Sequence, residues 1–230
     1  MQWDDDGYLL NRNRYGENSA IIEFYTSVHG KVSGVLYGAT SKKIKNYLLV
    51  GNKFHISFKS KNENQLGYFK IEINEITTPH YLDNPKKLSC IISTMNLVKL
   101  LTVDNQTNNE IFKLINIFFE NLNNDNWINE LIFWELNLFK LIGYDLELKS
   151  IVSKETINGE NFYYVSSNDQ KKYVPSFLIE NNKNEKNLLQ ILNGLKLVTD
   201  FLDKSILKPN NITHPKSRID FLNIIKNWFI

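Results

Sequence analysis

The first 80 residues alternate apolar and polar positions with the two-residue period of β-strands. The clearest case is the segment 53–59, where Phe54, Ile56 and Phe58 share one face of a strand and the polar residues between them share the other. Four more segments have this period or are rich in β-formers: residues 8–12, 20–25, 31–37 and 69–73. Glycines at 30, 34, 38 and 51 fit turns and barrel corners. Five short strands predict a small closed barrel of the OB type.

After Pro79 the apolar positions recur with the period of a helix. Asn84 followed by Pro85 is typical of a helix start, and apolar residues then continue as far as Leu101. Further helices are expected over about residues 109–122, 125–143, 185–202 and 217–228.

The helix expected over residues 125–143 is central to the second part of the chain. Asp125 is its expected cap, and Gly143 is well placed to end it. One stripe along this helix is apolar and consists of Leu131, Trp134, Leu138 and Leu141. Two of its residues, Trp134 and Leu138, are predicted to be core.

Residues 149–175 interrupt the helical pattern. Asn158 and Gly159 are a hairpin turn signal, residues 162–165 favour a strand, and Pro175 ends a short run. Strands followed by helices indicate an α+β chain with two domains. We expect an N-terminal OB-fold β-barrel over residues 1–80 and a mainly helical C-terminal domain over residues 81–230, with a hairpin-like insertion at about 149–175.

Composition removes several function classes. The chain of 230 residues has one cysteine, Cys90, which excludes a disulfide framework and most zinc cages, and its four histidines are dispersed. There is neither a phosphate loop ending in Gly-Lys-Ser/Thr nor a Gly-x-Ser-x-Gly elbow. The three acids at 4–6 are expected to be a solvated, poorly ordered terminus. We therefore expect no catalytic residues, no metal and no cofactor.

The ends and apolar runs of the chain indicate its compartment. The first residues are acidic where a signal peptide needs a basic start, and no apolar run approaches the length that spans a bilayer. The sequence predicts a cytoplasmic protein with no membrane partner.

Positive charge is concentrated in one part of the chain. The net charge is +2 overall, but residues 31–70 contain eight lysines and a single acid, Glu63. A local excess of one sign is typical of a surface that binds a polyanion. The candidate nucleic-acid-binding residues are Arg12, Arg14, Lys31, Lys42, Lys43, Lys45, Lys53, Lys59 and Lys61.

Three aromatic residues near this charge are candidates for base stacking: Tyr37, Tyr47 and Phe58. Their commoner role is core packing. A lysine-rich face produced by composition alone is the alternative to a nucleic-acid surface.

Several segments of the chain follow one another in a specific order and spacing. An Arg-rich strand leads into Gly16-Glu17-Asn18-Ser19, then a Thr26-to-Gly30 spacing, then Gly38-Ala39-Thr40-Ser41-Lys42. Further on come Phe133-Trp134-Glu135-Leu136 and Lys216-Ser217-Arg218. Together these segments resemble the bacterial RecO family of recombination mediators, and the last two are similar to its central helix and its C-terminal segment.

This resemblance implies a non-enzymatic DNA repair protein associated with the nucleoid. Such a protein binds single- and double-stranded DNA, anneals complementary strands and helps load recombinase onto gaps coated by single-strand-binding protein. The implied partners are RecR and the C-terminal tail of single-strand-binding protein. The residues implied to bind partners in the helical domain are Phe133, Lys140, Lys216 and Arg218.

The chain departs from the family pattern at two places. Many relatives carry a four-cysteine zinc module where residues 149–175 contain no cysteine, and some place Arg where this chain has Phe133. Two other functions stay open: a protein-interaction scaffold whose lysines are incidental, and a nucleic-acid enzyme with an unrecognised site.

Overall fold

The computed structural model describes residues 1–62, 65–157, 159–167 and 170–229. The chain divides into two compact units, which we describe separately. The first comprises Met1–Lys113 and Pro215–Trp228, and the second comprises Leu114–His214 and the end of the chain. The domain boundary predicted near residue 80 stays a prediction.

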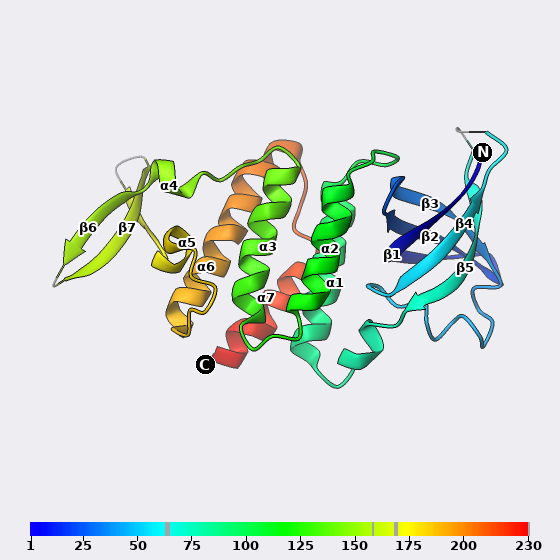
Figure 1. Ribbon diagram of the computed structural model, residues 1–230, viewed down its shortest axis with the longest axis horizontal. Helices are drawn as coiled ribbons and strands as arrows, with labels where there is room; N and C mark the ends of the chain where they lie inside the picture. The colour runs from blue at the N-terminus through cyan, green and yellow to red at the C-terminus, as the bar shows by residue number, and fades with distance from the viewer. Residues whose placement is uncertain (63–64, 158, 168–169, 230) are drawn as a thin grey trace. The chain divides into compact units, whose positions relative to one another are not determined.

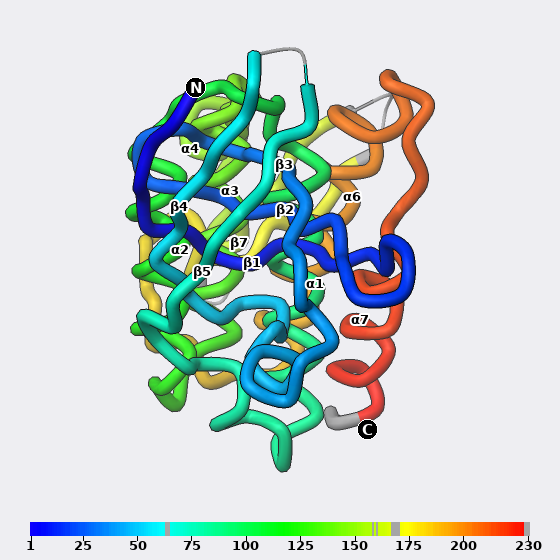
Figure 2. The backbone as a smooth tube through the Cα atoms, turned by 90° about the vertical axis from the view of Figure 1, so that its right-hand side faces the viewer, coloured from blue at the N-terminus to red at the C-terminus, as the bar shows by residue number. Residues whose placement is uncertain are grey.

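A closed five-stranded barrel forms the beginning of the first unit (Figures 1 and 2). Its strands are β1 (Gln2–Tyr15), β2 (Ser19–Thr26), β3 (Gly30–Tyr37), β4 (Lys53–Lys59) and β5 (Gly67–Glu75). They close in the order β1–β2–β3–β5–β4, and only β3 and β5 pair in parallel. The predicted OB-type barrel is confirmed.

Aromatic rings fill the barrel where β3 meets β5. Phe24 packs edge-on against Phe69, and Phe58 lies 5.3 Å from Phe69 between ring centroids. Gly34 and Gly67 are directly paired across the two strands. A Cβ atom on Gly34 would lie 2.7 Å from the Phe69 ring, and one on Gly67 would lie 2.3 Å from the Phe58 ring. The barrel therefore closes over large rings because its two closing strands have glycine at the contact.

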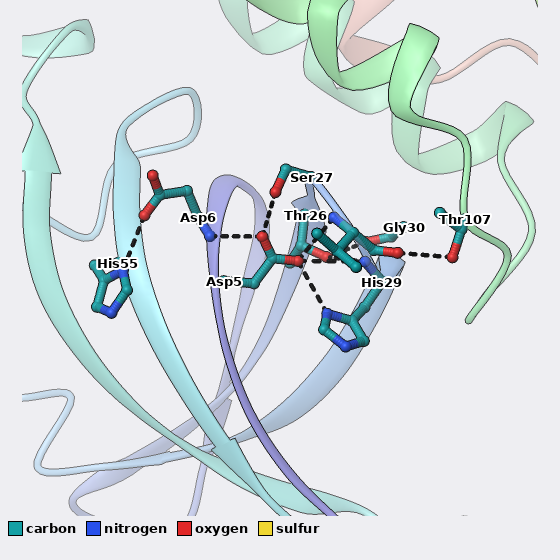
Figure 3. A network of polar contacts seen from close by, with 9 residues as sticks. Asp5, Asp6, Thr26, Ser27, His29, Gly30, His55 and Thr107 are labelled. Carbon is teal, nitrogen blue, oxygen red and sulfur yellow. Dashed lines mark hydrogen bonds and ion pairs between the residues drawn. The ribbon is translucent and has the colours of Figure 1, made fainter.

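The acidic N-terminal residues belong to β1, so the prediction of a solvated, poorly ordered terminus is wrong. Asp5 is only 6% exposed. Its carboxylate accepts hydrogen bonds from the Ser27 hydroxyl and from the backbone N–H groups of Val28, at 2.9 Å, and His29, at 3.2 Å (Figure 3). The His29 Nδ1 atom lies 3.0 Å from the same carboxylate. The turn between β2 and β3 thus supplies the donors that let β1 bury a charge.

The same β2–β3 turn also holds the segment that follows helix α1 (Pro85–Leu101). The Thr107 hydroxyl donates to the Val28 carbonyl at 2.7 Å (Figure 3), and the Asn105 N–H donates to the Lys31 carbonyl at 2.8 Å. Gly30 has a φ of +68°, and a Cβ atom there would lie 2.0 Å from the carbonyl oxygen of Gln106. Asp5 therefore holds the β2–β3 turn in place, and this turn holds residues 105–107.

Helices complete the first unit. A short 3-10 helix, η1 (Thr78–Tyr81), precedes α1, whose cap is Asn84, as predicted: its side chain accepts from the Lys87 N–H. Helix α7 (Lys216–Phe229) is joined to α1 by a hydrogen bond from Asn96 to Ser217.

The second unit contains the remaining elements. They are the end of α2 (Asn109–Asn121), α3 (Trp127–Leu141), α4 (Leu148–Ile151), β6 (Ser153–Ile157), β7 (Glu160–Ser167), β8 (Gln170–Val174), α5 (Ser176–Glu180), α6 (Leu188–Phe201), the π-helical η2 (Leu202–Leu207) and the 3-10 turn η3 (Lys208–Asn210). The prediction of a mainly helical C-terminal region is confirmed. None of the helices in the described ranges has the length and apolarity to span a membrane.

Helix α3 differs at its start from the prediction and agrees at its end. Asn126, not Asp125, occupies the cap position, and its side chain donates to the Lys183 carbonyl at 2.9 Å. Gly143, with a φ of +92°, follows the last turn as expected. Trp134 and Leu138 are buried, so their predicted core role is confirmed. The Trp134 indole N–H donates to the Leu114 carbonyl at 2.6 Å, which satisfies its polar atom.

The insertion after α4 is a three-stranded antiparallel sheet in the order β6–β7–β8. The turn between β6 and β7 includes Gly159, with a φ of +84°. Asn158, the other residue of the predicted turn, lies outside the described residues. The predicted hairpin is therefore extended by a third strand, β8.

Asp5→Asn tests whether the carboxylate holds the β2–β3 turn. An amide presents its own N–H groups to the donors of Val28 and His29, so we expect the free energy of unfolding to fall by about 2 kcal/mol. Asp4→Asn, at the exposed neighbouring position, is the control and should leave stability within about 0.5 kcal/mol of wild type. Urea denaturation of the three proteins makes the comparison, and equal stability of both variants would contradict the assignment.

The pH dependence of this effect has a definite sign. Burial raises the pKa of the Asp5 carboxyl, but hydrogen bonds from the turn, first those of Ser27 and His29, outweigh burial and lower it below the ordinary 3.8. A carboxyl whose pKa is lower in the folded state than in the unfolded state stabilises the fold at pH values above its unfolded-state pKa. This stabilisation is lost as the pH falls through the folded-state pKa. The stability difference between wild type and Asp5→Asn should therefore be constant above about pH 5 and shrink below pH 4. A difference that grows on acidification would contradict this.

Leu138→Ala tests the core of the second unit. Removing a fully buried leucine side chain typically costs about 2–5 kcal/mol, so the melting temperature should fall clearly. Asn137→Ala, at the exposed adjacent position, should change it little. An unchanged melting temperature for Leu138→Ala would mean that this position is not core.

Candidate nucleic-acid interface

Residues 38–47 form a compact loop that displays three lysines. The chain leaves β3 through Gly38, with a φ of +71°, and then turns tightly as Ile44 and Lys45 donate their N–H groups to the Ser41 carbonyl at 3.1 and 2.9 Å. Ala39 and Leu48 are buried in the barrel core at either end of the loop. Lys42, Lys43 and Lys45 between these anchors are exposed.

Hydrogen bonds join this loop to the β1–β2 hairpin. The Ala39 N–H donates to the Asn18 carbonyl at 3.1 Å, and the side chains of Thr40 and Asn18 are also bonded. The Arg12 guanidinium lies 3.4 Å from the Lys45 carbonyl oxygen, to which it donates. These contacts hold the loop with Lys42, Lys43 and Lys45 beside the strand that carries Arg12 and Arg14, and we call these five predicted cations the basic cluster.

Two other predicted lysines have contacts inside the first unit. The Lys31 ammonium, on a side chain that is 12% exposed, donates to the Lys99 carbonyl at 2.8 Å and lies 3.1 Å from the Asp104 carboxylate. The Lys53 ammonium lies 5.6 Å from the ring centroid of Tyr8 and is similarly close to a second ring. Both positions are therefore occupied in packing within the unit.

Lys59 and Lys61 are exposed at the end of β4. Lys59 pairs with Tyr68 across the ladder between β4 and β5. The structure gives these two lysines open surface, and within the described residues no contact joins them to the basic cluster.

Three tyrosines on the outside of the barrel form what we call the tyrosine face. Tyr15, Tyr37 and Tyr68 are 52%, 66% and 36% exposed. Tyr15 pairs with Ser19, and Ser19 pairs with Tyr37, so these side chains share one face of the sheet. The rings of Tyr37 and Tyr68 are 6.4 Å apart between centroids.

Of the aromatics considered for stacking from the sequence, only Tyr37 lies fully on the surface. Phe58 is buried in the barrel core and Tyr47 is half-buried. Tyr15 and Tyr68 were not singled out from the sequence. The alternation of Tyr68 with buried Phe69 is the signal that points it outward.

Another part of the barrel surface is acidic. His55 on β4 lies 3.0 Å from the Asp6 carboxylate, and Glu72 of β5 pairs with His55 across the ladder. The hydrogen bond to Asp6, followed by the charges of Asp6, Asp4 and Glu72, raises the pKa of His55. Carboxylates of Asp4, Asp6 and Glu72 therefore surround His55 on this part of the barrel.

The four residues expected to bind partners are divided between the two units. In the second unit, the Phe133 ring is half-buried and lies edge-on to Phe177, while the Lys140 ammonium pairs with Asp145 at 2.9 Å. The hydrogen bond to Asp145 raises the pKa of Lys140. In the first unit, Lys216 is exposed but Arg218 is fully buried. This burial leaves the Arg218 side chain no surface for a partner.

The described residues bring together no group of three or more His, Cys, Asp or Glu side chains that could hold a metal ion. Cys90 is buried in α1. Asp5, Ser27 and His29 are arranged with the carboxylate between the other two groups, so the hydroxyl has no imidazole base beside it. The hydrogen bonds among Asp5, Ser27 and His29 therefore hold the β2–β3 turn in place.

Comparison with known proteins identifies the relationship of the whole chain. A family model described as recombination protein O N terminal matches residues 1–76, and one described as recombination protein O C terminal matches residues 82–209. The chain is 23% identical to the DNA repair protein RecO of Rhodospirillum centenum over 97% of this chain and 94% of that protein. It is 25% identical to the DNA repair protein RecO of Ehrlichia chaffeensis over 100% of this chain and 89% of that protein.

Among solved structures, asparaginyl-tRNA synthetase of Entamoeba histolytica is similar with a TM-score of 0.30 and 8% identity, over 94% of this chain and 60% of that chain. A likeness this weak carries no argument about fold or function.

Lys31→Met separates a packed lysine from a surface one. Because the Lys31 ammonium is bonded to the Lys99 carbonyl, its loss should lower the free energy of unfolding by about 1 kcal/mol. The salt dependence of single-stranded DNA binding should stay unchanged in Lys31→Met. Lys42→Met should instead leave the free energy of unfolding unchanged and make the salt dependence of binding shallower. Urea denaturation and salt titration of both variants make the test. A shallower salt slope for Lys31→Met at unchanged stability would put Lys31 in the interface.

Proposed function

The chain belongs to the RecO family of DNA repair proteins, and from this premise we propose that it binds DNA on one side of its barrel and anneals complementary strands. The binding surface consists of the basic cluster and the tyrosine face. Annealing requires the charges of two strands to be neutralised and requires no bond to be made or broken, so the proposed activity needs no catalytic group.

The convergence of the basic cluster is the observation that carries this proposal. Its members come from β1 and from the loop after β3, and hydrogen bonds through Asn18 and Arg12 hold the two segments together. Cations held in this way release counterions from phosphates when DNA binds, which favours binding of both single and double strands. Phosphate contacts carry no base information, so the binding is independent of sequence.

The tyrosine face adds a preference for single strands. Bases are free to stack on protein rings only where they are not already paired, and such stacking is worth about 1–3 kcal/mol per base. Tyr37 is the most exposed of the three rings and directly precedes Gly38, where the loop of the basic cluster begins. The ring of Tyr37 therefore stands where the chain enters the loop that carries Lys42, Lys43 and Lys45.

The resemblance to RecO proteins extends the proposal to partners and place. The protein works with RecR and with the C-terminal tail of single-strand-binding protein, helps load recombinase onto coated gaps, and acts at the nucleoid. Phe133 and Lys140 of the second unit and Lys216 of the first are the candidate residues for partner binding. Arg218 is not carried forward, because it is buried.

Replacing Lys42, Lys43 and Lys45 together with alanine tests the phosphate contacts. The slope of log affinity against log salt is roughly −0.7 per phosphate neutralised on a single strand, so the variant should have a slope shallower by up to about 2. All three side chains are exposed, so the melting temperature should hardly change. Fluorescence anisotropy with an oligothymidine at several salt concentrations gives both slopes.

The control is a triple alanine variant of Lys149, Lys154 and Lys186, which are exposed lysines of the second unit. It should keep the wild-type slope. If the barrel variant also kept it, the lysines would be a solvated face, and a protein-interaction scaffold without direct DNA binding would become the better account.

Tyr37→Leu tests the stacking surface separately from charge. Loss of one stacked base should weaken oligothymidine binding about fivefold or more at constant salt slope, and duplex binding should change little. Tyr144→Leu, an exposed tyrosine of the second unit, should have no effect. Equal weakening of single-strand and duplex binding would contradict stacking while leaving the phosphate contacts intact.

A further inference from the structure

The described part of the second unit contains a pocket of about 640 Å³ that no step of the proposed DNA binding uses. One wall is the face of the small sheet: Val165 and Lys172 are paired across β7 and β8, so their side chains stand on the same face, and both line the pocket. Helix α6, in orange in Figure 1, supplies much of another wall. The volume lies in the range of about 300–1,000 Å³ that is usual for small-molecule sites.

The floor of the pocket is apolar. Leu197 and Phe201 are four residues apart and share one side of α6. The other apolar lining residues come from the sheet and from the region of α4: Leu146, Leu148, Ile151, Val165 and Val174. Most of these side chains are aliphatic and have no hydrogen-bonding atom to offer a ligand. The floor therefore favours a saturated apolar body, because a polar heterocycle would exchange its hydrogen bonds to water for few partners here.

Positive charge predominates at the mouth of the pocket. Four exposed charged side chains line it: Lys172, Lys196, Lys204 and Asp200. Within the described residues none of the four is in a salt bridge, whereas the neighbouring Lys171 is paired with Glu155. Lys196 lies one helical turn from Asp200 on α6 and offsets its charge, which leaves Lys172 and Lys204 for an anionic ligand.

Lys172 and Lys204 lie close together. They are within hydrogen-bonding reach of each other, and this contact with a like charge lowers the pKa of Lys172. Lys204 and Ser205, which both line the pocket, belong to the π-helical η2, and π-helical turns are rare and frequent at functional sites. Two ammonium groups in contact repel each other, and an anion between them would relieve the repulsion.

We propose that this pocket binds a small amphiphilic anion, an acyl chain that ends in one carboxylate. The chain lies on the floor formed by Leu148, Leu197 and Phe201, and the carboxylate lies between Lys172 and Lys204 at the mouth. Burial of the chain supplies most of the affinity, and the two lysines fix which end of the ligand faces solvent. A free phosphate would use the lysines and leave the apolar floor empty.

This site goes beyond the proposed DNA binding and is independent of it, since the described lining residues all belong to the second unit. Its test is calorimetric titration of the full chain with octanoate, decanoate and dodecanoate below their micellar concentrations. Each added methylene should tighten binding about threefold to fourfold while the chain still fits the pocket. Octyltrimethylammonium, with the same chain as octanoate and the opposite charge, should bind at least about tenfold more weakly than octanoate.

Replacing Lys172 and Lys204 together with alanine tests the mouth of the pocket. The double variant should bind octanoate about tenfold more weakly, the sum expected of two partly exposed ion pairs, and should bind the uncharged octanol as wild type does. Both side chains are exposed, so the melting temperature should hardly change. The matched control is the double alanine variant of Lys154 and Lys186, exposed lysines of the second unit outside the described lining, and it should bind octanoate as wild type does.

Three results would overturn the proposal. One is equal binding of octanoate by wild type and the Lys172 and Lys204 double variant, or equal binding of octanoate and octyltrimethylammonium by wild type. Another is an affinity that does not change with chain length, which would mean that the floor is not used. The third is competition by inorganic phosphate or adenosine monophosphate at concentrations as low as those of octanoate, which would mean a simple anion site or a nucleotide site. None of these outcomes bears on the barrel, whose oligothymidine binding should be unchanged in the double variant.

Discussion

The burial of one carboxylate, that of Asp5, is the constraint on which the first unit depends. A charge in this position is stable only if several donors surround it, and the β2–β3 turn provides them from Ser27, Val28 and His29 (Figure 3). Once fixed, the turn holds residues 105–107 through the Val28 carbonyl and the close approach at Gly30. A single ionic group thus couples the first strand of the barrel to the segment that follows α1.

The barrel could be predicted because each of its strands is specified by the residues within that strand and its turns. Alternation within residues 53–59 and glycines at the turns specify strands without reference to the rest of the chain. The role of Asp5 could not be predicted in this way, because its donors lie more than 20 residues away and exist only once the strands have paired. For the same reason a buried cation such as Arg218 looks like any surface arginine in the sequence.

The candidate interface was predictable in part. The excess of lysine over residues 31–70 indicates a region of positive charge, but not which of its lysines are used in packing. Lys31 and Lys53 are occupied by contacts from other elements, while Lys42 and Lys43 are left exposed by a loop that has too few apolar residues to bury them. The charge of the sequence therefore predicts the region of a candidate interface. Contacts with distant parts of the chain decide which lysines of that region stay exposed.

The central claim is that one side of the barrel binds single-stranded DNA, and hydrogen–deuterium exchange with and without an oligothymidine tests it most directly. The account predicts slower exchange of backbone amides over residues 12–19 and 38–47 when the oligonucleotide is bound, with no change over the acidic surface around His55. Protection confined to residues 114–214, or no protection in the barrel at saturating oligonucleotide, would contradict it.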